Sequence, residues 1–420
     1  MSGSLAISEE LTPELNAANE SQSGSIAVIW HRFGPYHLAR LSACARAFRV
    51  IGIEMSGSDL TYAWKPENGP VPFPRHTLYP TVDCSTVDNR TVAASISRTL
   101  TELKPSAVAI PSWGAPYSLA ALAWCLQNAT PAVVMVDSNP ADKDRHGARE
   151  WLKRRIVSCF GAGLACKPDY LVALGMRREV IKLGYNVVDN RYFETASEKS
   201  RHAGAEARRQ HGLPRPFFLV VARFVPKKNL AALIAAYAVF RTQSEGNAVD
   251  LVLLGDGPLK DDLRTQVSQL GLAGTVHFPG FAQYDTLPDW YGMALGLILP
   301  STIEQWGLVV NEAMAAGLPV LVSDRCGCAS SLVEANSNGW TFPPDDIAAM
   351  AARMRDLANL PDGGKAFGQR SREIIAAWSP ERFAQELLSA TQVSAKDKKR
   401  HLWLRRLLLW LLISRVKDTE

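Results

Sequence analysis

The sequence predicts an α/β protein with two Rossmann-like domains, each built on a parallel sheet. Its 420 residues, 47% of them hydrophobic, are enough to form two separate cores. Apolar runs at Leu295–Leu299 and Pro319–Val322 flank a helical pattern at Leu308–Ala316, an order typical of a parallel strand–helix–strand unit. The same order recurs near the start of the chain, where Ser25–Trp30 and Arg49–Glu54 enclose a helical segment.

Composition argues against several classes of function. The formal net charge of +5 is a mild excess, and no recognition motif or aromatic-rich basic patch accompanies it, so we expect no nucleic-acid partner. The seven cysteines are scattered without a CxxC pair, which favours free thiols in a reducing cytosol. No run of about 18 apolar residues predicts a membrane span. Residues 1–24 are polar and predict a disordered tail rather than a secretory signal.

The loop Ser301–Gly307 follows the first strand of the later unit and is the strongest candidate site. Ligands of open α/β sheets bind outside the carboxyl ends of the strands. Glu304 in this loop and Glu312 in the next helix place two carboxylates near a helix amino terminus at Gly307 and Leu308, whose free N–H groups suit a phosphate. We therefore expect a sugar-nucleotide site. The alternative is a solvated Glu304 and a surface ion pair at Glu312.

This stretch also resembles a known family. EQWGLVVNE, from Glu304 to Glu312, resembles the Glu-x7-Glu signature of retaining glycosyltransferases of the GT-B fold, in the group 1 or family 4 class. The trailing EAMAAGLPVLVS matches too, and the resemblance extends over Pro216–Pro344 and, more loosely, Ser25–Phe193. It implies two domains facing a cleft and transfer of a hexose-type sugar, with retention, from a nucleotide diphosphate sugar. It implies no cofactor and no required metal.

The resemblance also assigns residues to the donor. Arg223 and Lys228 resemble the pair that clamps the donor diphosphate, and two cations at a helix start suggest an anion between them because they oppose the helix dipole. Gly255 and Gly257 let the chain turn close to a ligand, and the resemblance puts base-reading backbone groups near Phe278.

The two glutamates have separate expected roles. We expect Glu312 to accept hydrogen bonds from the ribose hydroxyls and Glu304 to contact the transferred sugar. Because no nucleophile is obvious, we expect front-face transfer, in which the leaving phosphate helps to deprotonate the acceptor.

The first domain offers weaker candidates. His31 opens a loop in which Gly34 matches the family's glycine-rich loop, facing acceptor and donor phosphates. His31 and His37 are candidates for acceptor binding or acid–base work, or are polar loop residues. Many relatives carry a histidine after the strand at Ala132–Asp137, whereas this chain has Asp137 there. Asp137 could hold the sugar or the acceptor hydroxyl, or it could cap a helix.

Three further segments allow simple predictions. Asp142 and Asp144 match the Asp-x-Asp metal motif of the other glycosyltransferase fold, but they lie away from the expected donor site, so we discount them. Arg145–Phe160 predicts a basic amphipathic helix that lies either on an anionic membrane or, equally well, on an ordinary protein surface. We also expect a strand at Tyr170–Leu174 and a long loop at Lys65–Cys84.

These predictions divide the chain into six segments: a tail at 1–24, a first, acceptor-side domain at 25–195, a linker at 196–212, a nucleotide-sugar domain at 213–378, a helix crossing back onto the first domain at 379–395, and a basic tail at 396–420. The tail has eight Lys or Arg and an apolar run, Leu407–Ile413, that is too short to span a bilayer. It predicts a helix lying in the headgroup region, and a core helix is the alternative.

Together these features predict a glycosyltransferase in bacterial-type polysaccharide or glycolipid assembly. Its expected partners are a nucleotide-sugar donor, a lipid-linked or saccharide acceptor and a membrane surface. The expected location is peripheral, on the cytoplasmic face of the inner or plasma membrane. The alternatives are a nucleotide-sugar epimerase, a sucrose-type synthase, and a catalytically inactive nucleotide-sugar-binding membrane partner.

Overall fold

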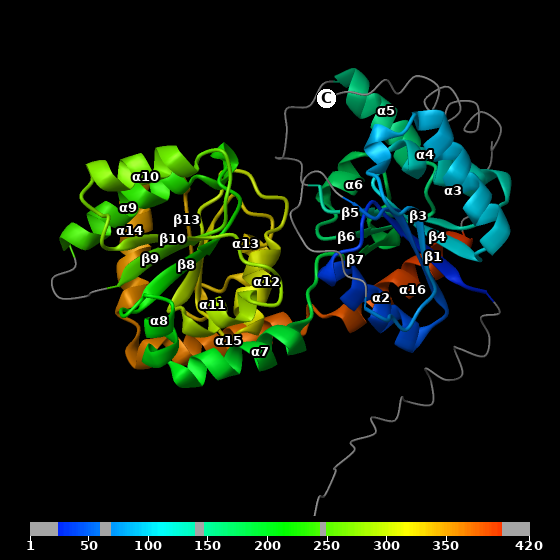
Figure 1. Cartoon of the computed structure of the whole chain (residues 1–420). Coiled ribbons are helices and arrows are strands. Elements are labelled where there is room, and N and C mark those ends of the chain that lie inside the picture. Colours follow the sequence, from blue (N-terminus) through cyan, green and yellow to red (C-terminus); the bar gives the residue numbers. More distant parts are fainter. Residues whose placement is uncertain (1–23, 59–68, 139–146, 244–248, 397–420) are drawn as a thin grey trace, which may run out of the picture.

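The computed structural model describes residues 24–58, 69–138, 147–243 and 249–396. They form two α/β domains, each with a parallel sheet between layers of helices (Figure 1). This arrangement confirms the predicted fold class. The amino-terminal tail, Asp142 and Asp144, and the basic tail after Lys396 lie outside the described residues.

The first domain has a seven-stranded parallel sheet in the order β3-β2-β1-β4-β5-β6-β7. Its strands are β1 (Ile26–Trp30), β2 (Val50–Ser56), β3 (Arg75–Tyr79), β4 (Ala107–Pro111), β5 (Ala132–Val136), β6 (Ala162–Ala165) and β7 (Ile181–Leu183). Its helices and 3-10 turns are α2 (Pro35–Ala47), η1 (Cys84–Thr86), α3 (Asn89–Leu103), α4 (Pro116–Gln127), α5 (Gly147–Val157), α6 (Asp169–Ala173) and η2 (Arg178–Val180). The interior strand β1 pairs with both neighbours, with Val28 opposite Gly52 and Ala109.

The second domain has a six-stranded parallel sheet in the order β10-β9-β8-β11-β12-β13. Its strands are β8 (Phe217–Val221), β9 (Asp250–Leu254), β10 (Val276–Gly280), β11 (Gly296–Leu299), β12 (Val320–Ser323) and β13 (Gly339–Phe342). Its helices and 3-10 turns are η3 (Pro226–Lys228), α9 (Leu230–Gln243), α10 (Lys260–Gln269), α11 (Leu287–Met293), α12 (Leu308–Ala315), α13 (Ala329–Leu332), α14 (Ile347–Ala358), η4 (Pro361–Gly364) and α15 (Lys365–Ala376). Helices cover both faces of the sheet, which explains why its strands are continuous apolar runs rather than alternating ones.

Residues 196–212, predicted as a linker, are mostly helical. They belong to α7 (Asn190–Ala203) and α8 (Ala205–Gln210), and α7 packs against α11 and α12 of the second domain. The contact is close because Gly292 of α11 lies against the backbone of Ser197. The prediction missed this helix packing because small residues and one aromatic make the buried side of α7, so few large apolar residues mark it.

The helix α16 (Pro380–Lys396) lies on the first domain although it ends the described chain. It packs against α2 and against the strands β4 to β7, and Phe383 and Leu387 are fully buried there. The hydroxyl of Ser394 donates to the carbonyl of Ala132, 3.1 Å away. This close approach requires Gly161, because an added Cβ there would lie 2.2 Å from the Ser394 hydroxyl.

Three segments of the first domain differ from the sequence predictions. Residues 170–174 lie mainly in helix α6 rather than a strand, because a short apolar run is compatible with either state. The predicted loop at 65–84 contains the edge strand β3, which is polar and only half buried, so no apolar pattern revealed it. The strand β6 consists of Ala, Gly and Leu and gave no β signal.

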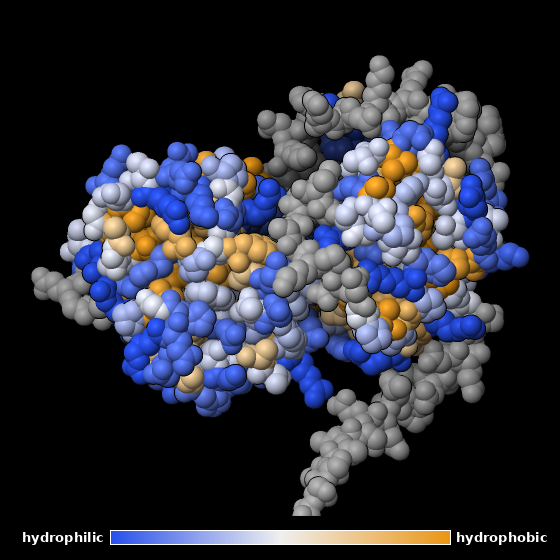
Figure 2. Space-filling view, viewed as in Figure 1, coloured by the Kyte–Doolittle hydropathy of each residue, from blue (hydrophilic) through white to orange (hydrophobic). Residues whose placement is uncertain are grey.

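Hydrophilic residues cover much of both domains in the view of Figure 2, with small hydrophobic areas between them. None of the described helices is both long enough and apolar enough to cross a membrane.

Candidate functional site

Both sheets reverse their strand order beside their first strand. β1 lies between β2 and β4, and β8 lies between β9 and β11. Ligands of doubly wound folds bind in the crevice outside the carboxyl ends of strands at such a switch point. His31 follows β1, Lys228 follows β8 and Glu304 follows β11, so the residues predicted from sequence are placed where this rule expects a ligand.

An ion pair between Lys228 and Glu304 forms the centre of the site in the second domain. The side chains are only 17% and 15% exposed. Two contacts fix the surrounding loops: Asn229 donates to the carbonyl of Pro300 at 3.2 Å, and the N–H of Thr302 donates to the carbonyl of Lys227 at 2.9 Å. The structure therefore brings together two predicted site residues that are 76 positions apart.

Arg223 lies exposed in the loop after β8, and two glycines shape the loop beside it. A Cβ at Gly255 would lie 1.9 Å from the carbonyl oxygen of Ala222, and one at Gly257 would lie 2.7 Å from backbone atoms of Phe224. Both glycines also have positive φ values of +146° and +157°. These glycines let the β9 loop pack onto the loop that carries Arg223, a structural role that the ligand-facing prediction did not include.

Phe278 of β10 packs against the core of the second domain. Its ring lies 6.1 Å from that of Phe224, and the guanidinium of Arg264 lies 5.7 Å above it. The side chain of Phe278 therefore holds the end of β10 in place. Only the backbone groups of Phe278 are left for the predicted contact with a base.

The helix α12 begins at Leu308, directly after Gly307. Gly307 has a φ of +104°, and a Cβ there would lie 2.7 Å from the Leu299 side chain, so glycine is required at this position. The buried indole of Trp306 donates to the side chain of Asn311 at 2.8 Å and so holds the start of the helix in place.

Glu312 is fully buried, which the sequence did not predict. The hydroxyl of Tyr291 donates to its Oε2 at 2.5 Å, and the hydroxyl of Tyr36, from the first domain, donates to its Oε1 at 2.5 Å. Burial raises the pKa of the Glu312 carboxyl to about 7, and the two hydroxyl donors oppose that shift. The alternative of a surface ion pair at Glu312 is therefore wrong.

On the first domain, Gly34 and His37 build the start of α2. The N–H of Gly34 donates to Nδ1 of His37 at 3.1 Å. Burial, with the nearby Arg40 charge, lowers the pKa of His37 to about 3, so its ring stays neutral at physiological pH. The hydrogen bond from Gly34 gives His37 a structural role at the start of the helix.

Asp137 follows β5 at the carboxyl edge of the first sheet and is half buried. Its carbonyl accepts a hydrogen bond from the thiol of Cys166 at 3.2 Å. The pKa of Tyr185 rises to about 12, first through burial and then through the charge of Asp137. Asp137 is thus near Tyr185 and the buried Arg40. The segment that Asp137 would cap lies outside the described residues.

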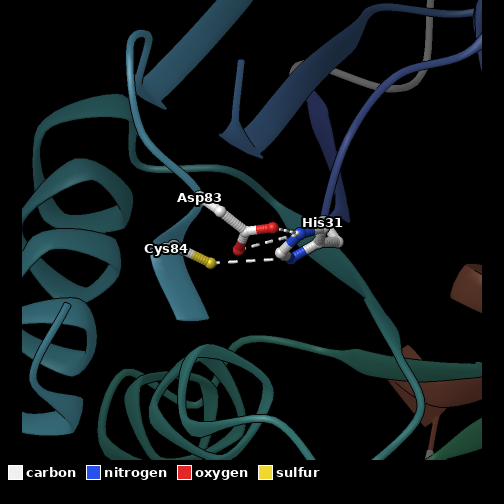
Figure 3. A group of neighbouring side chains, drawn as sticks. All are labelled: His31, Asp83 and Cys84. Carbon is white, nitrogen blue, oxygen red and sulfur yellow. Dashed lines mark hydrogen bonds and ion pairs between the residues drawn. The ribbon is translucent and has the colours of Figure 1, made fainter. Parts of the chain in front are cut away.

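His31 belongs to a cluster with Asp83 and Cys84, which approach it from the segment after β3 (Figure 3). Its Nε2 lies 3.3 Å from a carboxylate oxygen of Asp83, and its Nδ1 lies 3.5 Å from the Cys84 sulfur. The two contacts use different ring nitrogens, and one metal ion can bind only one of them. The arrangement therefore fits a ring oriented by a carboxylate better than a metal centre.

Sequence reasoning missed Tyr36, Tyr291, Asp83 and Cys84. Tyr36 and Arg40 are four positions apart in the GPYHLAR segment, so they share one face of α2, which was the only available signal. Nothing in the sequence pairs Tyr36 with a residue 276 positions away, or His31 with one 52 positions away.

Comparison with known proteins supports the sequence resemblance. Residues 205–374 match the family model for group 1 glycosyl transferases. The chain is 29% identical over 199 residues to the alpha-D-kanosaminyltransferase of Streptomyces kanamyceticus, covering 47% of this chain and 50% of that protein. It is 30% identical over 194 residues to the GDP-mannose-dependent alpha-(1-6)-phosphatidylinositol monomannoside mannosyltransferase of Mycobacterium tuberculosis, covering 44% and 50%. The matched stretches thus span about half the length of these curated relatives.

The fold is similar to that of solved glycosyltransferase structures. Anabaena Alr3699/HepE, solved in complex with UDP, superposes with a TM-score of 0.67 at 18% identity. The superposition covers 87% of this chain and 98% of that chain. This likeness extends over both domains and confirms the predicted GT-B fold.

Proposed function

We propose that the protein is a retaining glycosyltransferase that transfers a hexose-type sugar from a nucleotide diphosphate sugar to a saccharide acceptor. The observation that carries the proposal is the pairing of Lys228 with Glu304 beside the amino terminus of α12, at the switch point of the second sheet. A cation, a carboxylate and free helix N–H groups are the groups that a sugar diphosphate needs. The family match over residues 205–374 and the GT-B fold support the same reaction class.

Each group has a role in this reaction. Lys228 and Arg223 stabilise the negative charge that develops on the leaving diphosphate. The N–H groups at Gly307 and Leu308 face the same phosphates, and Glu304 positions the transferred sugar. In the front-face step, the bond from C1 to the phosphate oxygen breaks, the acceptor oxygen bonds to C1 from the same side, and its proton passes to the leaving phosphate. This scheme uses no metal.

The acceptor side is assigned to the first domain. His31 with Asp83, and Asp137, lie at the carboxyl edge of its sheet, where they can hydrogen-bond saccharide hydroxyls. A lipid-linked acceptor at the cytoplasmic face of a membrane fits helix α5, in which Trp151 is 55% exposed under the guanidinium of Arg155 at 5.3 Å. The mycobacterial relative, named for a phosphatidylinositol monomannoside, supports an acceptor of this kind. A role in glycolipid or polysaccharide assembly is part of the same proposal.

Thermal unfolding in the presence of nucleotide diphosphates tests the donor class. UDP, GDP, ADP and dTDP, each with a representative sugar conjugate, should include one that raises the melting temperature of the full chain. That donor should then release its nucleotide diphosphate when a saccharide or lipid-linked acceptor is added, with or without excess EDTA. Failure of every nucleotide to stabilise the protein would overturn the proposal, and inactivation by EDTA that Mg²⁺ reverses would overturn its metal-free form. A product of inverted configuration would exclude retention.

A further inference from the structure

A tyrosine–glutamate–tyrosine cluster joins the two domains at Glu312, with Glu312 and Tyr291 buried and Tyr36 half buried. Tyr291 and Glu312 belong to the second domain, whereas Tyr36 reaches them from α2 of the first domain. Both hydroxyls lie 2.5 Å from the carboxylate, one on each oxygen. The Tyr36 side chain packs against the hydrophobic cluster of the second domain, with its ring centroid 5.7 Å from that of Tyr284 in an edge-to-face arrangement.

The first domain holds Tyr36 in a fixed position. The residue lies in the first turn of α2, where Pro35 fixes the backbone and His37 accepts the N–H of Gly34. One turn later, the buried guanidinium of Arg40 donates twice to the carbonyl of Val187, at 3.0 and 3.2 Å. Tyr36 therefore moves with its own domain as a rigid projection, whereas Tyr291 moves with Glu312.

Because the two tyrosines belong to different domains, they have different effects on the accessibility of the Glu312 carboxylate. Glu312 has no exposed surface in this arrangement, so a ribose cannot reach its oxygens. Separation of the domains would withdraw Tyr36 and leave Oε1 available, while Tyr291 would stay on Oε2. Burial and the adjacent carboxylate raise the pKa of both tyrosine hydroxyls well above the usual value, so both remain protonated donors.

We infer that Tyr36 competes with the donor nucleotide for Glu312, so that the nucleotide site becomes available only when the first domain withdraws this one hydroxyl. The inference rests on the proposed function, in which Glu312 binds the ribose. It makes Tyr36 a positioning residue that acts on donor binding through Glu312 from the opposite domain.

Replacement of single hydroxyls tests the inference directly. Tyr36→Phe keeps the packed ring and removes the competing donor, so the Kd of the nucleoside diphosphate that binds the wild type should fall roughly tenfold, the scale of one hydrogen bond to a charged group. Tyr291→Phe removes the matching hydroxyl from the other oxygen but leaves the competitor in place, so nucleotide binding should weaken. Isothermal titration calorimetry on the full chain, with UDP and GDP as first probes, measures both constants.

A second contact between the domains supplies a matched control. Lys167 of the first domain donates to the hydroxyl of Ser330 in the second domain at 3.0 Å, on the exposed surface. Ser330→Ala should change nucleotide affinity less than twofold, because exposed polar contacts contribute little.

The possible outcomes separate the inference from the proposed function. Unchanged or weaker nucleotide binding by Tyr36→Phe overturns the inference, as does equal tightening by Tyr291→Phe or Ser330→Ala. Thermal unfolding of each variant shows whether it is folded, and Tyr36→Leu repeats the measurement if the phenylalanine variant is not. If the wild type binds no nucleoside diphosphate at all, the proposed function fails first and the inference fails with it.

Discussion

The two edges that face each other across the domains are built from different chemistry. On the second domain, Arg223, Lys228 and Glu304 carry fixed charges on loops that hydrogen-bond to one another. On the first domain, the corresponding edge has aromatic and imidazole groups, such as Tyr185 and His31, with carboxylates beside them. A sugar diphosphate carries permanent charge and needs fixed cations, whereas an acceptor hydroxyl needs hydrogen bonds and shape. This contrast is the reason for proposing that the donor binds at the edge of the second domain and the acceptor at the edge of the first.

The largest expected effect comes from removing a donor-side cation. Lys228→Ala should lower turnover by about 100-fold or more, the scale for losing one preorganised charge-stabilising group. Lys227→Ala is the matched control, because Lys227 is the exposed neighbour in the same turn and carries the same charge. Initial rates of nucleotide release measure both variants. Wild-type turnover by Lys228→Ala would contradict the proposal that the donor diphosphate binds at this edge of the second domain.

The two glutamates should separate binding from transfer. Glu304→Gln should leave the affinity for free nucleotide within about twofold while transfer falls by about 100-fold, because Glu304 is assigned to the sugar. Glu312→Gln should weaken nucleotide binding by roughly tenfold. Calorimetry for binding and radiolabelled donor for transfer give the two readouts, and equal loss of affinity in both variants would contradict the division.

A smaller effect is expected on the acceptor side. Asp83→Asn weakens the contact that orients the His31 ring, so the acceptor kcat/KM should fall by about tenfold with nucleotide affinity unchanged. Steady-state kinetics at saturating donor measure the first quantity, and calorimetry measures the second. Loss of nucleotide affinity in this variant would show that the edges do not divide the two substrates.

The smallest effect is on stability and depends on pH. Burial raises the pKa of Glu312 to about 7, whereas Tyr36 and Tyr291 lower it and Tyr284 faces the same hydroxyls. The folded chain thus keeps a proton that the unfolded chain releases, so this stabilisation is present below the ordinary glutamate pKa and is lost as pH rises through about 7. The melting temperature of Glu312→Gln minus that of the wild type should therefore rise by about 2 to 4 °C when the pH is raised from about 5.5 to about 8. Parallel pH profiles for the two proteins would contradict this.

Local signals in the sequence predicted most of the fold and the donor edge. Strand β8 and the segment from Glu304 to Glu312 are continuous patterns, so periodicity and a short motif were enough to find them. The environment of Glu312 could not be predicted, because its partner Tyr36 comes from the other domain and only the domain packing brings them together. The contact between His31 and Asp83 could not be predicted either, because folding brings together two residues that are far apart in the sequence. Strand β6 was missed because its small residues have no strong preference for a strand.

The position of α16 has a consequence for how the chain is made. A ribosome releases the seven strands of the first sheet long before residues 380–396, so the face that Phe383 and Leu387 cover stays open to water until those residues have been synthesised. The second domain, by contrast, is built from consecutive elements, from α7 to α15. The domain that begins first should therefore finish folding last, and its nascent form is the one that most needs protection from aggregation during translation.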